Sequence, residues 1–194
     1  MRIVGGELRG RALSGPKSQA IRPTSDRARE SLFNIMTHSY PGAVDGARVL
    51  DVFAGTGALG MEALSRGADF ALFLELGAEG RALIRSNIDA LGLGGKTKIS
   101  RRDATRPGPV GAQKPFDLIF ADPPYGKSLG TTALIALLDN GWISPNALVV
   151  LEESAAAMPP SIDGFQRLDV RQFGESAISF FAAHETRSTF DHSG

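Results

Sequence analysis

The 194-residue sequence contains no cysteine and only three scattered histidines, His38, His184 and His192. Without cysteine the chain cannot form disulfide bonds, a thiolate nucleophile or a cysteine-ligated zinc site, and we expect no metal. The sequence also lacks an apolar run long enough to span a membrane, and its arginine-containing N-terminus lacks the apolar stretch of a signal peptide. We therefore expect a cytoplasmic protein that acts as a monomer and has no membrane partner.

Net charge is also absent, because 21 basic residues balance 21 acidic residues. Attraction to nucleic acid must therefore come from an uneven distribution of charge along the chain. Residues 1–29 are uneven in this way, since they hold seven arginines and lysines against the two acids Glu7 and Asp26. A basic segment of this kind binds phosphates or is simply a solvated N-terminus, and charge alone leaves both interpretations open.

Residues 49–60, with the sequence VLDVFAGTGALG, change from an apolar run to clustered glycines and then to helical spacing. This order predicts a strand, a tight turn and a helix, the arrangement of a nucleotide-binding unit. Gly55, Gly57 and Gly60 match G-x-G-x-x-G, which dinucleotide-binding enzymes also carry. Asp51, at the end of the predicted strand, would repel a pyrophosphate but attract the ammonium and sulfonium groups of S-adenosylmethionine. We therefore expect S-adenosylmethionine as the cofactor.

Two further acids end predicted strands. Glu75 follows an apolar run and lies 20 positions after Gly55, where a doubly wound fold places an acid that accepts hydrogen bonds from both ribose hydroxyls. An exposed carboxylate at a strand end is the alternative interpretation. Asp103 and Ala104 end a third predicted strand over residues 98–102. Asp103 either accepts a hydrogen bond from the adenine amino group or serves as a turn or cap residue.

The candidate chemical site is Asp122-Pro123-Pro124-Tyr125, directly after a predicted strand over residues 116–121. Two successive prolines make a rigid turn without N–H donors, so only acceptors remain. Asp122 and the Pro123 carbonyl could then accept hydrogen bonds from an exocyclic amine and align its lone pair for methyl transfer. Tyr125 would stack on a base that flips out of the nucleic acid. A purely structural turn is the alternative.

The alternation of apolar runs and helical spacing predicts an α/β fold with a seven-stranded, mostly parallel sheet. Residues 165–173 and 177–183 leave no room for a helix between them, so the last strand should be antiparallel. We divide the chain into a basic extension over residues 1–21, a catalytic domain over residues 22–183 and a disordered tail over residues 184–194. The extension is expected to form a small β-hairpin around Gly5, Gly6 and Gly10.

Four stretches occur in the order found in the RsmD family of bacterial 16S ribosomal RNA guanine-N2 methyltransferases, which the sequence resembles over nearly its whole length. They are MRIVGG at residues 1–6 with RGR at 9–11, RPTSDR at 22–27 with RE at 29–30 and LFN at 32–34, FAGTGALG at 53–60, and DPPY at 122–125. The two N-terminal stretches are the specific ones, because the glycine loop and the tetrapeptide are shared with many other methyltransferases.

The resemblance implies a Rossmann-like, class I S-adenosylmethionine-dependent methyltransferase fold, with 16S ribosomal RNA of the small subunit as the partner. It implies that S-adenosylmethionine contacts Asp51, Phe53, Ala54, Gly55, Thr56, Gly57, Glu75, Asp103 and Ala104. The target guanine would be held by Asp122, Pro123, Pro124 and Tyr125. The ribosomal RNA would contact Arg2, Arg9, Arg11, Arg22, Arg27 and Arg29.

Other functions remain open at this point. A methyltransferase of the same fold could act on a DNA amino group, although no target-recognition domain is evident. A non-enzymatic RNA-binding or ribosome-assembly factor would also use the basic extension, but it would have no need of Asp51, Glu75 and Asp122 together. A nicotinamide dehydrogenase is disfavoured, since neither Asp51 nor the tetrapeptide serves hydride transfer.

Overall fold

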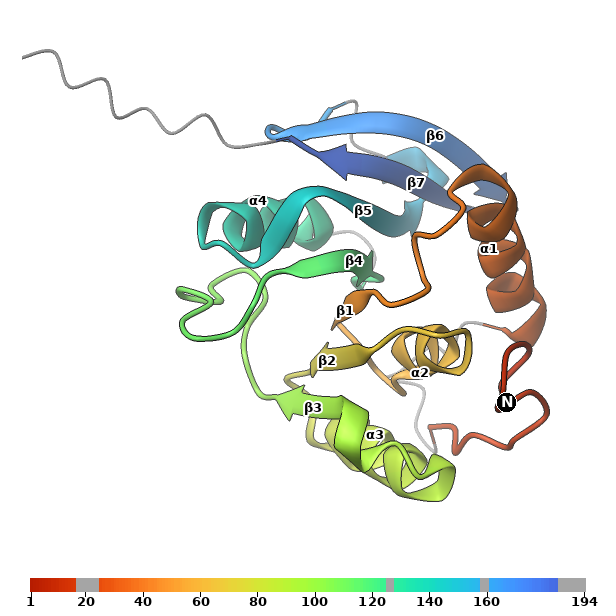
Figure 1. Ribbon diagram of the computed structural model, residues 1–194. Coiled ribbons are helices and arrows are strands. Elements are labelled where there is room, and N and C mark those ends of the chain that lie inside the picture. Colours follow the sequence, from red (N-terminus) through yellow and green to blue (C-terminus); the bar gives the residue numbers. More distant parts are fainter. Residues whose placement is uncertain (17–24, 125–127, 158–160, 185–194) are drawn as a thin grey trace, which may run out of the picture.

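The computed structural model describes residues 1–16, 25–124, 128–157 and 161–184. Figure 1 shows helices and strands alternating along most of this length. In chain order the elements are α1 (Asp26–Ser39), β1 (Arg48–Val52), α2 (Ala58–Ser65), β2 (Phe70–Leu74), α3 (Ala78–Leu91), η1 (Gly94–Lys96), β3 (Thr97–Ser100), β4 (Phe116–Ala121), α4 (Leu129–Asp139), β5 (Ile143–Ser154), η2 (Ala155–Ala157), β6 (Phe165–Phe173) and β7 (Ser176–Ala183).

The strands form a seven-stranded sheet in the order β3-β2-β1-β4-β5-β7-β6. Strands β1 to β5 all run parallel to one another. Strand β7 is antiparallel to both β5 and β6. This confirms the predicted α/β fold and its antiparallel last strand. The reversal follows from the sequence, because only Gly174 and Glu175 separate β6 from β7, and two residues suffice for a tight turn but not for a crossover helix.

The apolar strands are buried because both faces of the sheet are covered. In Figure 1 helices α1, α2 and α3 lie on one face and α4 lies on the other. Alternate residues of each strand accordingly enter two separate cores: Val49 of β1 packs with the three helices, and Leu50 packs on the α4 side. Burial on both faces explains why β1, β2 and β4 are nearly continuous apolar runs.

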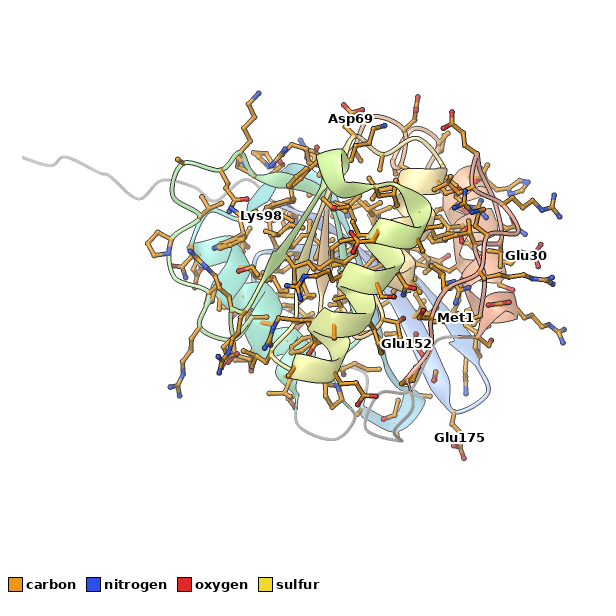
Figure 2. All side chains as sticks on the ribbon, turned by 90° about the horizontal axis from the view of Figure 1, so that it is seen from below. Met1, Glu30, Asp69, Lys98, Glu152 and Glu175 are labelled. Carbon is orange, nitrogen blue, oxygen red and sulfur yellow. The ribbon has the colours of Figure 1, made fainter. Side chains whose placement is uncertain are left out.

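The position of a ligand site follows from the strand order. The chain builds β2 and β3 on one side of β1 and then crosses to β4 on the other side, which makes β1 and β4 the switch point of the sheet. In open sheets ligands bind outside the carboxyl ends of the strands at this point. Figure 2 locates the two ends: Asp69, just before β2, and Glu175, just after β6, lie at opposite ends of the molecule. The carboxyl edge is the end marked by Glu175, since β6 is parallel to β5.

The N-terminal segment folds back on itself without forming a strand in the described residues. Its antiparallel pairing consists of a single bridge between Arg2 and Ala12, supported by the N–H of Ile3 donating to the Arg11 carbonyl at 2.9 Å. The side chains of Ile3 and Leu13 are buried in the core shared with α1, α2 and α3. The segment is therefore packed against the domain rather than projecting from it. Of the predicted tail, residues 185–194 lie outside the described residues.

Candidate active site

The glycine turn between β1 and α2 is held by Asp51. Its Oδ2 accepts a hydrogen bond from the N–H of Gly60 at 2.9 Å, which ties the end of the strand to the first turn of α2. Gly57 has a φ of 76° and caps α2 without a side-chain hydrogen bond. A Cβ on Gly60 would approach Phe73 Cε1 to 2.5 Å, so the third glycine of the pattern permits close packing of helix and strand.

The Asp51 carboxyl is nearly fully buried, with 3% of the residue exposed. Burial raises its pKa to about 8, the hydrogen bond from Gly60 opposes this rise, and the nearby carboxylates of Asp122 and Glu75 add to it. Burial penalises the negative charge because the carboxylate has lost its water. A cation placed beside these three acids would relieve that penalty. The turn is therefore suited to a positively charged ligand.

Glu75 connects the end of β2 to the same turn. Its Oε2 accepts from the N–H of Gly55 at 2.8 Å, and its Oε1 accepts from the N–H of Gly77 at 2.6 Å. The 20-residue spacing between Gly55 and Glu75 thus has a structural role as well as the predicted role in ribose binding. Each carboxylate oxygen can accept more than one hydrogen bond, so both remain able to receive a hydroxyl. The exposed side chain of Leu76 supplies an apolar surface beside this acid.

Asp103, after β3, is engaged in its own turn. Its Oδ1 accepts from both the N–H of Thr105 at 2.9 Å and the Thr105 hydroxyl at 2.7 Å. These hydrogen bonds lower the pKa of the Asp103 carboxyl, and burial only partly offsets them. This is the turn geometry that the sequence offered as the alternative to adenine binding. Ala104 is buried in the core on the α4 side.

The Asp122-Pro123-Pro124 turn begins where β4 ends. Asp122 is half-buried, and its N–H donates to the Val52 carbonyl at 3.4 Å, which joins the ends of β4 and β1. The Asp122 charge reaches Asp51, since it raises the pKa of that carboxyl. Pro123 is buried and Pro124 is exposed, whereas Tyr125 lies outside the described residues. The two acids predicted to serve the cofactor and the target amine therefore belong to one electrostatic site.

One of the arginines predicted to bind RNA is buried in the structure. Arg29 is fully buried, and its Nη2 donates to the Arg2 carbonyl at 2.5 Å and to Asp26 Oδ1 at 2.7 Å. A buried guanidinium used to join α1 to the N-terminal segment has no surface to offer to RNA. The other described arginines in the prediction are exposed: Arg2, Arg9, Arg11 and Arg27. Arg22 lies outside the described residues.

Sequence reasoning missed two buried polar side chains around this site. Asn87 of α3 is fully buried and donates from Nδ2 to the Thr56 carbonyl in the glycine turn at 3.2 Å. A signal was available, because Asn87 lies between Ile84 and Leu91 on the apolar face of a helix, where an amide needs specific partners. Glu62 of α2 is also fully buried, and its Oε2 accepts from the N–H of Val4 at 2.9 Å.

A third missed residue, Glu153, lies near the end of β5. Only 7% of it is exposed, and burial raises the pKa of its carboxyl. A Cβ on Gly130 would lie 2.9 Å from Glu153 Oε1 and 3.2 Å from Pro123 Cγ, so the carboxyl packs at the start of α4 beside the proline turn. The sequence alone did not place Glu153 on the carboxyl edge, because that placement requires knowing that β5 extends to Ser154.

Within the described ranges, no group of three or more histidine, aspartate or glutamate side chains could hold a metal ion. No helix in the part of the chain that the structure describes is long and apolar enough to cross a bilayer.

Residues 1–182 match the model of a protein family described as conserved hypothetical protein 95. The chain is 37% identical over 162 residues to the ribosomal RNA small subunit methyltransferase D of Escherichia coli strain K12, covering 84% of this chain and 79% of that protein. It is 38% identical over 185 residues to the putative rRNA methyltransferase YlbH of Bacillus subtilis strain 168, covering 93% and 98%. The structure of the putative methyltransferase yhhF from Escherichia coli superposes with a TM-score of 0.80 at 31% identity, covering 96% of this chain and 99% of that one.

Proposed function

Because the chain belongs to the RsmD family of ribosomal RNA small subunit methyltransferases, we propose that it methylates the exocyclic N2 amine of a guanine in 16S ribosomal RNA. The methyl donor is S-adenosylmethionine. The observation that carries this proposal is the convergence of Asp51, Glu75 and Asp122 on the glycine turn. Three acids around a backbone turn fit a cationic, ribose-containing donor and an amine that becomes cationic during attack.

Residues 53–57 and Asp51 would hold the methionine end of the cofactor. Asp51 holds the turn through Gly60, and its ionised form, which a nearby cation would favour, would attract the sulfonium. Glu75 accepts hydrogen bonds from the ribose hydroxyls while keeping the backbone amides of Gly55 and Gly77. Leu76, Asp103 and Ala104 would hold the adenine. In this arrangement Asp103 would accept a further hydrogen bond on a carboxylate that Thr105 already keeps charged.

The cofactor supplies a methyl group on a sulfonium, and transfer to nitrogen leaves S-adenosylhomocysteine. Asp122 and the Pro123 carbonyl accept hydrogen bonds from the two N–H groups of the guanine amine, so that its lone pair is directed at the methyl carbon. The nitrogen gains a positive charge as the new bond forms, and the Asp122 carboxylate stabilises that charge. The methylated, cationic amine would then release one proton to water, which leaves a neutral secondary amine. No strong base is needed before the transfer.

Two features support RNA as the substrate: the exposed arginines near the N-terminus and the proline turn after β4. Arg2, Arg9, Arg11 and Arg27 are exposed on the side of the molecule that carries the N-terminal segment and α1, and they would contact phosphates. A guanine amine in structured RNA cannot reach the carboxyl edge of a sheet unless the nucleotide flips out. Tyr125 would then stack on the flipped base.

One experiment tests the proposal against its competitor. The protein and labelled S-adenosylmethionine are incubated with free 16S ribosomal RNA, with unmodified small subunits and with duplex DNA, and the modified base is mapped. We expect label on the N2 amine of one guanine in the ribosomal RNA and none with Asp122→Ala. Label on a DNA amine would establish the competing function, and cofactor binding without transfer to any substrate would contradict both.

A further inference from the structure

One buried side chain connects the cofactor turn to the N-terminal segment. Asn87 Nδ2 donates to the Thr56 carbonyl in the turn and to the Ser14 carbonyl, each at 3.2 Å. Asn87 Oδ1 accepts from the N–H of Ser14 at 2.7 Å. Both N–H groups and the oxygen of the amide are therefore used. Because a fully buried amide has no water with which to replace a lost partner, Ser14 and the turn can separate only by breaking these hydrogen bonds, so order in one favours order in the other.

The rest of the N-terminal segment is attached to the two helices that flank the turn. The N–H of Val4 donates to Glu62, the Ser65 hydroxyl donates to the Gly5 carbonyl at 2.6 Å, and the N–H of Leu8 donates to Ser65 Oγ at 2.9 Å. Glu62 and Ser65 belong to α2, which starts immediately after the glycine turn. Arg11 Nη2 donates to the Ala90 carbonyl of α3 at 2.6 Å. The segment thus packs on α2 and α3, with Asn87 as its direct contact to the turn.

We propose that Asn87 is a positioning residue that couples RNA binding by residues 1–14 to cofactor binding at the turn. The inference rests on the proposed function, which places S-adenosylmethionine on the turn and RNA on the exposed arginines of the segment. A ligand that orders the turn fixes Thr56, and through Asn87 it also fixes Ser14. The second ligand then binds a segment that is already ordered, so its affinity rises. Linkage requires the effect to be equal in both directions.

A purely structural role for Asn87 makes a different prediction. If the amide only stabilised the fold, its loss would lower the melting temperature and weaken both ligands, but each ligand would affect the other as before. The quantity that distinguishes the two roles is therefore the ratio of RNA affinities with and without cofactor, and not either affinity alone. Ser86, the exposed neighbour of Asn87 on α3, provides a matched control position.

The experiment measures binding of unmodified small subunits with and without saturating S-adenosylhomocysteine, which cannot transfer a methyl group. Binding of S-adenosylhomocysteine alone is measured by calorimetry. We expect S-adenosylhomocysteine to raise RNA affinity about fivefold or more in the unaltered protein and in Ser86→Ala. In Asn87→Ala the ratio should fall below about twofold although both ligands still bind.

Asn87→Asp provides a second variant with little change in volume. It keeps an acceptor for the Ser14 N–H but can donate at most one hydrogen bond, so it cannot hold both Thr56 and Ser14 and should also lose the coupling. If neither variant folds, amide exchange in the unaltered protein decides: S-adenosylhomocysteine should slow exchange at Ser14 by about fivefold or more. An unaltered protein without cooperativity, or an Asn87→Ala protein that keeps it, would overturn the inference while leaving the methyltransferase intact. Failure of either ligand to bind the unaltered protein would instead contradict the proposed function.

Discussion

Glu75 and Asp103 follow neighbouring strands and were both predicted to hold the adenosine, yet their carboxylates are used differently. Glu75 accepts hydrogen bonds from the backbone N–H groups of Gly55, 20 positions earlier, and of Gly77. In the described part of the chain, Asp103 accepts hydrogen bonds from the N–H and the hydroxyl of Thr105, two residues away. The Glu75 contacts join separate segments into one site, whereas those of Asp103 close a single turn. An acidic residue that follows a strand can thus join separate segments of the site or only shape a turn at its border.

The largest effect should come from Asp122, the acid that we propose acts on the target amine and not on the cofactor. Asp122→Ala should lower the rate of methylation by about 10²- to 10³-fold, because one preorganised group facing the developing charge is lost. Asp122→Asn keeps an acceptor oxygen without the negative charge and should give an intermediate rate. Single-turnover methylation of small subunits measures both, with cofactor affinity as the control that stays nearly constant. Near-normal turnover in Asp122→Ala would remove this residue from the mechanism.

Glu75→Ala and Asp103→Ala test whether the two acids contribute differently to cofactor binding. Glu75→Ala should weaken S-adenosylmethionine binding by about 1.5 to 3 kcal/mol, because charged hydrogen bonds to the ribose are lost. Asp103→Ala should weaken binding by about 1 kcal/mol or less, since it removes a local turn and at most one contact to the adenine. Calorimetry with each variant gives the two values. An Asp103 effect as large as that of Glu75 would show that the two strand ends contribute alike.

A smaller effect, dependent on pH, is expected at Asp51. Its pKa of about 8 lies above the unfolded value, so the folded carboxyl is protonated where the unfolded one is charged. The free energy of unfolding should therefore fall as pH rises from about 4 to 8, and Asp51→Asn should flatten this fall. Cofactor affinity should change in the opposite direction.

If the charged carboxylate binds the sulfonium, affinity should rise about fivefold between pH 7 and pH 8, as the ionised fraction grows from about a tenth to a half. Calorimetry in buffers of different ionisation enthalpy should detect a proton released on binding. Asp51→Asn should bind more weakly at pH 8, without this pH dependence or proton release. An affinity that does not change across this range would show that the ligand does not sense the Asp51 charge.

The smallest effect concerns the exposed arginines. Arg9→Gln and Arg27→Gln should each reduce the slope of log affinity for RNA against log salt by about 0.7 to 0.9, one phosphate contact apiece. Lys98→Gln is the matched control, because Figure 2 places Lys98 on the side of the molecule opposite Met1 and Glu30. A larger change of the slope with Lys98→Gln would indicate that RNA binds at β3 and not at the N-terminal segment. Deleting the segment is a poorer test, since Ile3 and Leu13 belong to the core.

Local sequence patterns were sufficient to predict the fold and the backbone elements that surround the candidate site. The strand, turn and helix around Asp51 and the antiparallel β7 follow from apolar spacing and from the length of the connections. The burial of Arg29 was not predictable in this way, because it depends on a carbonyl of Arg2 and on Asp26 in the folded chain. The same is true of the N-terminal segment, whose short antiparallel pairing is supplemented by hydrogen bonds to Glu62 and Ser65 of α2. The cofactor and RNA contacts stay predictions.

The attachment of the N-terminal segment also has a consequence for the order of events during synthesis. Val4 donates to Glu62, and Ser14 is held by Asn87, so the partners of this segment are translated 58 and 73 residues later. Chains emerge at about 5 to 20 residues per second, so these positions must wait several seconds before α2 and α3 are available. During that interval Ile3, Leu13 and the arginines remain exposed together on an unfolded chain beside the ribosome that is making it. The segment should thus acquire its final contacts only after α3 is complete at Leu91, although before β4 to β7 have been made.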